Sequence, residues 1–328
     1  MSTHEVPVVR IALEPHPNAD TLSIARVFGF TCCVRTADWK DGVLAAYIAP
    51  DYTVPLDRPE FAFLVRANKP KDRERIKVKK LRGVFSQGLL IRAPADTAEG
   101  QDVREALGVE RYQPPFNLST GGEAGPGPSG IVAPKYDVEN WYRYGHLFKP
   151  DERVLVTEKL HGASARYVFA EGRMFVGSHG EWKRDGIAPI WYRALEVTPN
   201  IRTFCEAYPG HVLYGEVYGQ VQDLRYGTGK GEVRFAGFDV RRPDGQWWNW
   251  LTAFAQANAY GLPWVPLVYD GPYDAEKIEG FSNGVTTVPG AEHVREGVVV
   301  QAAEDRFVDE LGGRLKLKIV SNAYLERA

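Results

Sequence analysis

The sequence predicts two domains of the α+β or all-β class. Segments of the strand type dominate both halves, and only a few segments have the pattern of a helix. A doubly wound parallel sheet is disfavoured because strands and helices do not alternate along the chain. Residues 118–130 are rich in Gly, Pro and Ser, which is typical of a linker or exposed loop. We therefore expect a first domain at 1–112, a linker at 113–135 and a second domain at 136–328.

The first domain is predicted to contain mainly short strands rich in β-branched and aromatic residues. These strands are expected near 7–13, 22–34, 43–48, 61–66 and 76–92, followed by one helix at 101–111.

The second domain repeats this strand-dominated pattern with two longer helices. Its strands are expected near 152–156, 165–170, 173–177, 211–217, 233–240, 295–301 and 314–320. Helices are expected at 189–208 and 249–260, and Gly261 and Pro263 should end the latter because both residues stop helices.

Composition excludes several classes of protein. The chain has 328 residues, a charged fraction of 25% and a net charge of −2, so it is long enough for two cores and is not a charged disordered tail. No apolar run is long enough to cross a bilayer, and the first residues lack a secretion-signal pattern. Cys32, Cys33 and Cys205 lack metal-ligand spacing. We expect a reduced, cytoplasmic protein, by default a monomer.

A basic segment lies at 66–82, where nine Lys or Arg residues accompany two acidic residues. Such a run is often only a solvated face. A concentrated positive surface in a near-neutral protein also attracts phosphate groups, because like charges repel until an anion binds. The candidate nucleic-acid-binding residues are Arg73, Arg75, Lys77, Lys79, Lys80 and Arg82.

Two stretches around this segment resemble the tRNA-binding-type OB-fold module. They are "HPNADTLSIARV" (16–27) and "IKVKKLRGVFSQGLL" (76–90). In that family the first stretch leads into the first barrel strands, and the second forms a turn that closes the barrel. The resemblance implies a five-stranded barrel with an open face and loops for oligonucleotides. OB folds also mediate protein contacts, so the fold alone does not identify the ligand.

The stretch "TEKLHGAS" (157–164) places a lysine at a strand end in the second domain. Lys159 follows an alternating apolar run, and Gly162 permits a tight turn before the next strand. We therefore expect Lys159 on a hairpin-like bend. An ordinary solvated lysine explains this stretch equally well. The other motifs of the second domain must therefore decide whether Lys159 is a functional residue.

Four companion motifs follow in order. "LYGEVYG" places Glu216 at a strand end, "FAGFDV" places Phe238 in a strand, and "REGVVVQ" places Glu296 before an apolar run. "RLKLKIV" alternates, so Lys316 and Lys318 should point to one face of a strand. Each motif alone is explained as core, capping acid or wet sheet face, but all of them in this order are hard to explain in that way.

With Lys-x-x-Gly at Lys159, the set resembles the ATP-dependent RNA ligase family. The resemblance is to its nick-sealing branch, which has Lys-x-His-Gly in the first motif, and to Deinococcus-type members with an OB module in front. "YDVENWYRY" (136–144) is similar to that branch's approach to the active site. The resemblance spans nearly the whole chain. It implies an α+β protein with an N-terminal OB-fold barrel followed by an antiparallel-sheet nucleotidyltransferase domain.

Two positions depart from the family pattern. Ser164 stands where the branch often has Asn, and an arginine-bearing second motif is only loosely matched within 177–184. The residue of that second motif that meets the nucleotide stays open between Ser178, His179, Lys183 and Arg184.

The resemblance also implies roles for the site residues. Lys159 would be the nucleophile, assisted by Lys316 and Lys318, and Glu296 would bind Mg²⁺ or Mn²⁺. Phe238 would stack on adenine, and Glu216 would accept a hydrogen bond from a ribose hydroxyl. Further contacts to ATP would come from Glu158, His161, Gly162, Ser164, Ser178 and Glu296.

The chemistry explains these residue types. Lysine would attack the α-phosphate of ATP, AMP would pass to an RNA 5′-phosphate, and a 3′-hydroxyl would displace AMP. A free lysine has a pKa of about 10.4, so only about one in a thousand is neutral at pH 7.5. Neighbouring cations such as Lys316, Lys318 and a divalent metal lower that pKa. The expected partner is a nicked duplex with RNA on the 3′-hydroxyl side and a template of RNA or DNA.

Other functions remain open from the sequence. "GTGKGE" (227–232) is not a phosphate loop, because it lacks the preceding glycine and the Ser or Thr after lysine. An RNA- or tRNA-binding protein without catalysis is the alternative outside enzymes. A DNA ligase or a capping guanylyltransferase is the alternative within covalent nucleotidyltransferases.

Overall fold

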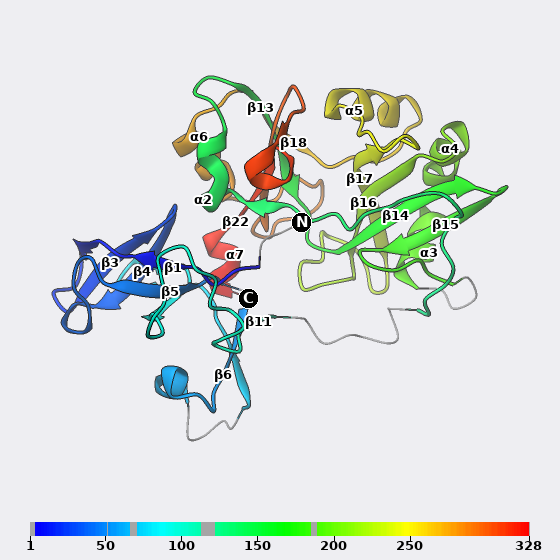
Figure 1. The fold of residues 1–328 in the computed structure, drawn as a ribbon. Helices are drawn as coiled ribbons and strands as arrows, with labels where there is room; N and C mark the ends of the chain where they lie inside the picture. The colour runs from blue at the N-terminus through cyan, green and yellow to red at the C-terminus, as the bar shows by residue number, and fades with distance from the viewer. Residues whose placement is uncertain (1–3, 51, 66–70, 113–121, 185–188, 328) are drawn as a thin grey trace. The chain divides into compact units, whose positions relative to one another are not determined.

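A computed structural model describes residues 4–50, 52–65, 71–112, 122–184 and 189–327 (Figure 1). The predicted α+β class is confirmed, since most strand pairs are antiparallel. By its contacts the chain divides into two compact units. The N-terminal unit comprises Ser2–Pro114, with Trp141–Arg143 and Asn322–Ala328. The C-terminal unit comprises Pro115–Asn140 and Tyr144–Ser321.

The N-terminal unit is built from short antiparallel strands around one apolar core. Its sheets have the orders β1-β5-β10, β2-β3-β4, β11-β6-β7 and β8-β9. The strands are β1 (Val8–Arg10), β2 (Leu13–Pro15), β3 (Leu22–Val27), β4 (Phe30–Arg35), β5 (Leu44–Ile48), β6 (Tyr52–Pro55), β7 (Arg73–Arg75), β8 (Lys79–Leu81), β9 (Val84–Ser86), β10 (Leu89–Arg92) and β11 (Glu110–Arg111). Val8, Ile48 and Phe61 are fully buried in the core. Helix α7 (Asn322–Arg327) joins this unit, where the side chain of Gln87 donates to Asn322.

Two predictions for this unit were wrong. The strand expected at 61–66 is a 3₁₀ helix, η2 (Pro59–Leu64), in its described part, because Pro59 starts a helical turn that buries Phe61. The helix expected at 101–111 is a series of turns that ends in β11. Gly108, with a φ of +64°, interrupts any helix there.

The C-terminal unit contains two larger sheets. The first has the order β12-β22-β19-β13-β18 and the second has the order β15-β14-β16-β17. The first sheet comprises β12 (Glu139–Asn140), β13 (Arg153–Lys159), β18 (Leu267–Pro272), β19 (Gly297–Ala302) and β22 (Lys316–Val320). The second comprises β14 (Ala163–Ala170), β15 (Arg173–Ser178), β16 (Val212–Gly219) and β17 (Val233–Arg241).

Helices cover the second sheet, as the green and yellow part of Figure 1 shows. They are α3 (Ile190–Val197), α4 (Asn200–Ala207) and α5 (Trp250–Ala259), and they bury Ile201, Phe204 and Ala253 against strand residues such as Leu213. The helix expected at 189–208 is present but is split before α4 by Pro199, which interrupts helical hydrogen bonding. The helix expected at 249–260 is confirmed as α5. Smaller elements are α2 (Trp141–Tyr144), α6 (Ala275–Phe281), β20 (Phe307–Val308) and β21 (Gly313–Arg314).

The bend after Lys159 is not a hairpin. Strand β13 belongs to the first sheet and β14 to the second, so the chain crosses between sheets within Leu160–Gly162. A Cβ on Gly162 would lie 2.1 Å from the carbonyl oxygen of Val217, so only glycine fits this crossing. The crossing places Lys159 where the two sheets adjoin.

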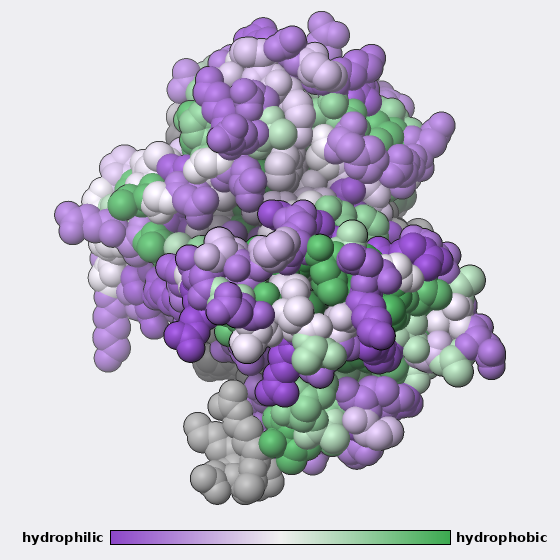
Figure 2. Space-filling view, turned by 90° about the vertical axis from the view of Figure 1, so that its left-hand side faces the viewer, coloured by the Kyte–Doolittle hydropathy of each residue, from purple (hydrophilic) through white to green (hydrophobic). Residues whose placement is uncertain are grey.

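The surface is mainly hydrophilic in the view of Figure 2, with hydrophobic side chains gathered in a few separate places. Phe63 and Val65, in and just after η2, are among the exposed large hydrophobic residues. In the part of the chain that the structure describes, no helix has the length and apolar character needed to cross a bilayer.

Candidate active site

Lys159 ends β13 and is paired in register with Gly297 of β19. Gly297 has no side chain, and a Cβ there would lie 2.0 Å from the carbonyl oxygen of Ile319. Only glycine therefore fits opposite Lys159, where β19 and β22 approach closely. The Nζ atom of Lys159 donates to Oε1 of Glu296 at 2.6 Å. The Lys159 side chain is 27% exposed and that of Glu296 only 9%, so a reactant can reach the lysine while its carboxylate partner is held by the protein.

His161 is fixed beside this pair by three contacts. Its Nε2 lies 2.8 Å from Oδ1 of Asp223, and its Nδ1 lies 3.5 Å from Oε1 of Glu296. Its backbone N–H donates to the hydroxyl of Tyr226 at 2.7 Å. Asp223 and Tyr226 were not predicted from the sequence, because no motif or spacing distinguishes them.

Glu216 completes the cluster from the second sheet. It lies on β16 opposite Ser164 of β14. Desolvation raises the pKa of Glu216 to about 8, and the charge of Glu296 adds to the rise. The charge of Lys159 and a hydrogen bond from the N–H of Gly162 act in the opposite direction. Lys159, Glu296 and Glu216 therefore act on each other electrostatically, and Glu216 is largely protonated at neutral pH.

Glu296 is held in its charged form. Burial alone would raise its pKa, but the charge of Lys159 and the hydrogen bond and charge of His161 lower it below the ordinary value. Its second oxygen, Oε2, is buried and has no hydrogen-bond partner among the described residues. The same holds for Oγ of Ser164. A buried polar atom without a partner costs free energy, which a bound ligand can recover.

The cluster suits a metal that arrives with a nucleotide. Within the described residues no group of three or more His, Cys, Asp or Glu side chains is arranged to hold a metal ion. Mg²⁺ commonly takes one or two carboxylates and completes its shell with phosphates and water. The unpartnered Oε2 of Glu296 fits one such contact.

Lys316 has partners of its own. Its Nζ donates to Oδ2 of Asp239 at 2.9 Å and to the hydroxyl of Tyr136 at 2.7 Å. Arg314 binds the same Asp239 oxygen at 2.7 Å. Burial lowers the pKa of Lys316, although Asp239 opposes this shift. Asp239 is 1% exposed, so two cations share one buried carboxylate there.

The first sheet brings the three proposed lysines to one face. In the ladder β13-β19-β22, Lys316 is in register with Gln301 and Lys318 with Val299. On β13, Leu155 pairs with Gln301 and Thr157 pairs with Val299. Lys159 lies four and two residues beyond these positions, so its side chain points to the same face of the sheet as Lys316 and Lys318. The predicted alternation of β22 is confirmed, because its intervening residues Leu317 and Ile319 are buried.

Phe238 is the extra residue of a β-bulge. Tyr214 pairs with Asp239 and Gly215 pairs with Gly237, so Phe238 has no partner on β16. Bulges redirect a side chain out of the regular alternation. The Phe238 ring lies 4.8 Å from that of Tyr136, which contacts Lys316. Phe238 is half-buried, so one part of its ring packs on protein and another is accessible.

Glu158 lies apart from this face. Alternation along β13 turns it away from Lys159. Its carboxylate accepts hydrogen bonds from the hydroxyl of Thr286 and from the backbone N–H and hydroxyl of Thr287, the latter two at 2.7 and 2.6 Å. Arg295 lies 3.5 Å away. The expected contact of Glu158 with ATP stays a prediction, and the described partners of its carboxylate are protein groups.

The loosely matched segment 177–184 forms a turn. The backbone N–H of Ser178 donates to the carbonyl of Glu181 at 2.8 Å, and its hydroxyl accepts from the N–H of Glu181 at 3.3 Å. Lys183 is buried and pairs with Glu181 at 3.0 Å. His179 lies 3.7 Å from Asp137, and the exposed Arg184 pairs with a second glutamate. Ser178 therefore shapes the turn, and the second motif stays unassigned.

The predicted basic residues differ in how much charge they can offer to a ligand. The Arg73 guanidinium donates to the carbonyls of Thr53 and Gly108, so it serves the fold. Arg75 stacks over the ring of Tyr112 at 4.2 Å and Lys80 over that of Phe85 at 5.1 Å. The remaining members, Lys77, Lys79 and Arg82, are exposed, and residues 66–70 of the segment lie outside the described residues.

Comparisons with known proteins agree with this arrangement. The RNA ligase family model matches residues 152–320, and a model described as an OB-fold domain matches residues 6–93. A mutant of the Naegleria gruberi RNA ligase with ATP and Mn is 23% identical, with a TM-score of 0.82, over 98% of both chains.

An apo mutant of the same protein is 23% identical, with a TM-score of 0.83, over 100% of this chain and 99% of that chain. The Naegleria gruberi RNA ligase with PPi is 24% identical, with a TM-score of 0.81, over 98% of both chains. The search of curated proteins returned no match. The predicted fold, an N-terminal OB fold with a ligase-type nucleotidyltransferase domain, is thereby confirmed.

Glu216 gives the first prediction. Its folded-state pKa of about 8 exceeds its ordinary value of 4.5, so between these pH values the unfolded chain is ionised while the folded protein keeps the proton. Stability should therefore fall as the pH rises through this window, and Glu216→Gln should remove that contribution. Urea unfolding at pH 5, 6, 7 and 8 should show that the free energy of unfolding of Glu216→Gln increases relative to that of the parent protein as the pH rises. The control Glu196→Gln changes an exposed residue and should show the same pH dependence of stability as the parent protein. The same pH dependence for Glu216→Gln and the parent protein would contradict the raised pKa of Glu216.

Glu158 gives the second prediction. Glu158→Ala removes the anionic partner of Arg295 and should lower the free energy of unfolding by about 3–5 kcal/mol, the usual cost of breaking a buried pair. Urea unfolding measures this loss, and the exposed Glu304→Ala is the control. Unchanged stability together with weaker use of ATP would instead show that Glu158 contacts the nucleotide.

Proposed function

The chain belongs to the RNA ligase family, and on that premise we propose that it is an ATP-dependent ligase that joins RNA 3′-hydroxyl and 5′-phosphate ends through a lysyl-AMP intermediate. The observation that carries this proposal is the accessible Lys159, held 2.6 Å from Glu296 and acting electrostatically on Glu216. All proposed chemical groups, from Lys159 to Lys318, lie within the matched residues 152–320.

Three displacements at phosphorus account for the reaction. The amine of Lys159 attacks the α-phosphorus of ATP, an N–P bond forms, and pyrophosphate leaves with the electrons of the broken P–O bond. An oxygen of the RNA 5′-phosphate then attacks the same phosphorus and releases the lysine. The RNA 3′-hydroxyl finally attacks the 5′-phosphorus, loses its proton and releases AMP.

Lys159 must lose a proton before the first step. The Nζ atom of Lys159 donates to Glu296, so Glu296 orients the amine, while positive charge from the metal, Lys316 and Lys318 would favour loss of its proton. Mg²⁺ or Mn²⁺ at Oε2 of Glu296 would supply positive charge against the phosphates. Lys316, positioned by Asp239 and Tyr136, and Lys318 would act on the α-phosphate from the same sheet face.

The remaining residues would recognise the nucleoside. Phe238 presents the accessible part of its ring for stacking on adenine. Glu216, protonated below a pH of about 8, can donate its O–H to a ribose oxygen as well as accept a hydrogen bond. Gly162 leaves room for close approach of the chain to Val217, and its N–H bonds to Glu216.

Labelling with α-labelled ATP and with α-labelled GTP tests the proposal. The purified protein is incubated with each nucleotide and a divalent metal, and covalent label is read on a denaturing gel. We expect an AMP adduct. A GMP adduct would indicate a capping guanylyltransferase, and no adduct with either nucleotide would indicate a binding protein without catalysis.

The proposed substrate is a nicked duplex with RNA on the 3′-hydroxyl side, on a template of RNA or DNA, bound by a monomer. Sealing should be faster at a nick with a ribose 3′ end than at a matched nick with a deoxyribose 3′ end. Single-turnover sealing with pre-adenylylated protein measures both rates. Equal rates would favour a DNA ligase.

Phe238 gives a prediction about binding rather than bond making. Phe238→Ala should raise the ATP concentration for half-maximal adduct by about tenfold, because one base stack on an aromatic ring contributes about 1–3 kcal/mol. The adduct at saturating ATP should survive. Phe307→Ala, which removes an exposed ring elsewhere, is the control. An unchanged ATP requirement with lower stability would make Phe238 a core residue only.

A further inference from the structure

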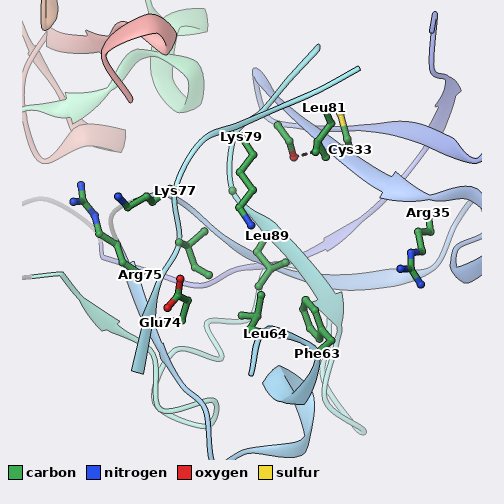
Figure 3. Close-up of a pocket in the computed structure, with 13 residues that line it drawn as sticks. Cys33, Arg35, Phe63, Leu64, Glu74, Arg75, Lys77, Lys79, Leu81 and Leu89 are labelled. Atoms are coloured by element: carbon green, nitrogen blue, oxygen red, sulfur yellow. Dashed lines mark hydrogen bonds between the residues drawn. The ribbon is translucent and has the colours of Figure 1, made fainter. Parts of the chain in front are cut away.

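A pocket of about 460 Å³ lies wholly within the N-terminal unit (Figure 3). It is formed where β4, η2 and the segment from β7 to β10 meet. This volume lies within the range of pockets that hold small organic groups. The proposed function does not use this pocket, since its chemical groups all belong to the C-terminal unit.

The floor of the pocket is apolar and its edge is aromatic. Leu64, Ile76, Leu81 and Leu89 line it, and Ile76 is buried. Phe63 lies at the edge and is 64% exposed, although it is a large hydrophobic residue. The structure thus offers a flat ring and an apolar surface to a ligand with a planar apolar face.

Four cations surround this floor. Figure 3 shows Lys79 extending toward Leu89, with Arg35 on one side of the pocket and Arg75 and Lys77 on the other. Neither Arg35 nor Lys79 makes an ion pair within the described residues. The one acidic lining residue, Glu74, pairs with Lys71 at 3.1 Å.

These two features together identify the ligand class. Uncompensated cations favour an anion, and phosphate is the anion that a nucleic-acid substrate carries. An aromatic edge over an apolar floor favours a planar base. A phosphate alone leaves the floor and Phe63 uncovered, and an apolar peptide leaves Arg35 and Lys79 without an anion.

We propose that this pocket binds one unpaired nucleotide of the RNA substrate. Its base lies against Phe63 and the leucine floor, and its phosphates lie at Lys79 and Arg35. The N-terminal unit then holds one unpaired nucleotide beside the nicked duplex in addition to paired backbone. This proposal rests on the proposed function, because it takes RNA as the substrate.

Binding of a fluorescent single-stranded RNA oligomer to the full chain tests the proposal by anisotropy. Phe63→Ala should weaken binding about tenfold, the effect of one lost base stack. Val65→Ala removes an exposed apolar side chain next to η2 that does not line the pocket, and it should bind as the parent does. Phe63 is exposed, so its loss should not disturb folding.

An oligomer of the same length with abasic sugar–phosphate units separates the two parts of the pocket. It keeps the phosphates and lacks the bases, so Phe63→Ala and the parent protein should bind it equally. Arg35→Ala with Lys79→Ala should reduce the slope of log affinity against log salt for both oligomers. Lys40→Ala, which removes an exposed charge outside the pocket, should leave binding within twofold of the parent.

Two results would overturn the proposal. One is that Phe63→Ala binds base-containing RNA as tightly as Val65→Ala does. The other is that the double variant Arg35→Ala with Lys79→Ala keeps the same slope of log affinity against log salt as the parent protein. The AMP adduct is measured on the parent protein and on the controls Val65→Ala and Lys40→Ala, where it should stay unchanged. Absence of the AMP adduct from the parent protein would instead overturn the proposed function. Failure of the pocket proposal and failure of the proposed function are therefore distinguishable.

Discussion

The crossing of the chain from one sheet to the other just after Lys159 is the constraint on which the site depends. Strand β13 must end and β14 must begin within Leu160–Gly162, and a side chain at Gly162 would meet Val217 at 2.1 Å. The crossing sets Lys159 at an edge opposite Gly297, where its amine donates to Glu296. Glu216 reaches the same region from the second sheet, so the group of charges exists only when both sheets are folded.

The buried carboxylates of Glu296, Asp239 and Glu158 each have basic partners. Glu296 is balanced by Lys159 and His161, Asp239 by Lys316 and Arg314, and Glu158 by Arg295. A buried pair contributes little net stability but is costly to break, so its value here is geometric: it fixes where each head group lies. Among the described residues, the buried polar atoms without a hydrogen-bond partner include Oε2 of Glu296 and Oγ of Ser164, which belong to residues proposed to meet the nucleotide.

Sequence reasoning predicted the fold class, most strands and the grouping of Lys159, His161, Glu216 and Glu296, because alternation and motif order survive folding. It did not predict the side-chain partners that come from distant segments. Glu158 adjoins the nucleophile in sequence but binds Thr286 and Thr287, and Arg73 lies in a basic run but bonds to Thr53 and Gly108. The bulge at Phe238 and the role of Asp239 depend on strand register, which one sequence does not reveal.

Identifying the residue that carries the covalent nucleotide decides whether Lys159 is the nucleophile. The protein is labelled with ATP, digested, and its modified peptide sequenced by mass spectrometry under conditions that preserve the phosphoramidate. AMP is expected on Lys159 alone, because among the lysines that the structure describes only Lys159 combines access, an orienting carboxylate and a place at the junction of the two sheets. AMP on Lys316 or Lys318, or on a lysine of the N-terminal unit, would contradict it.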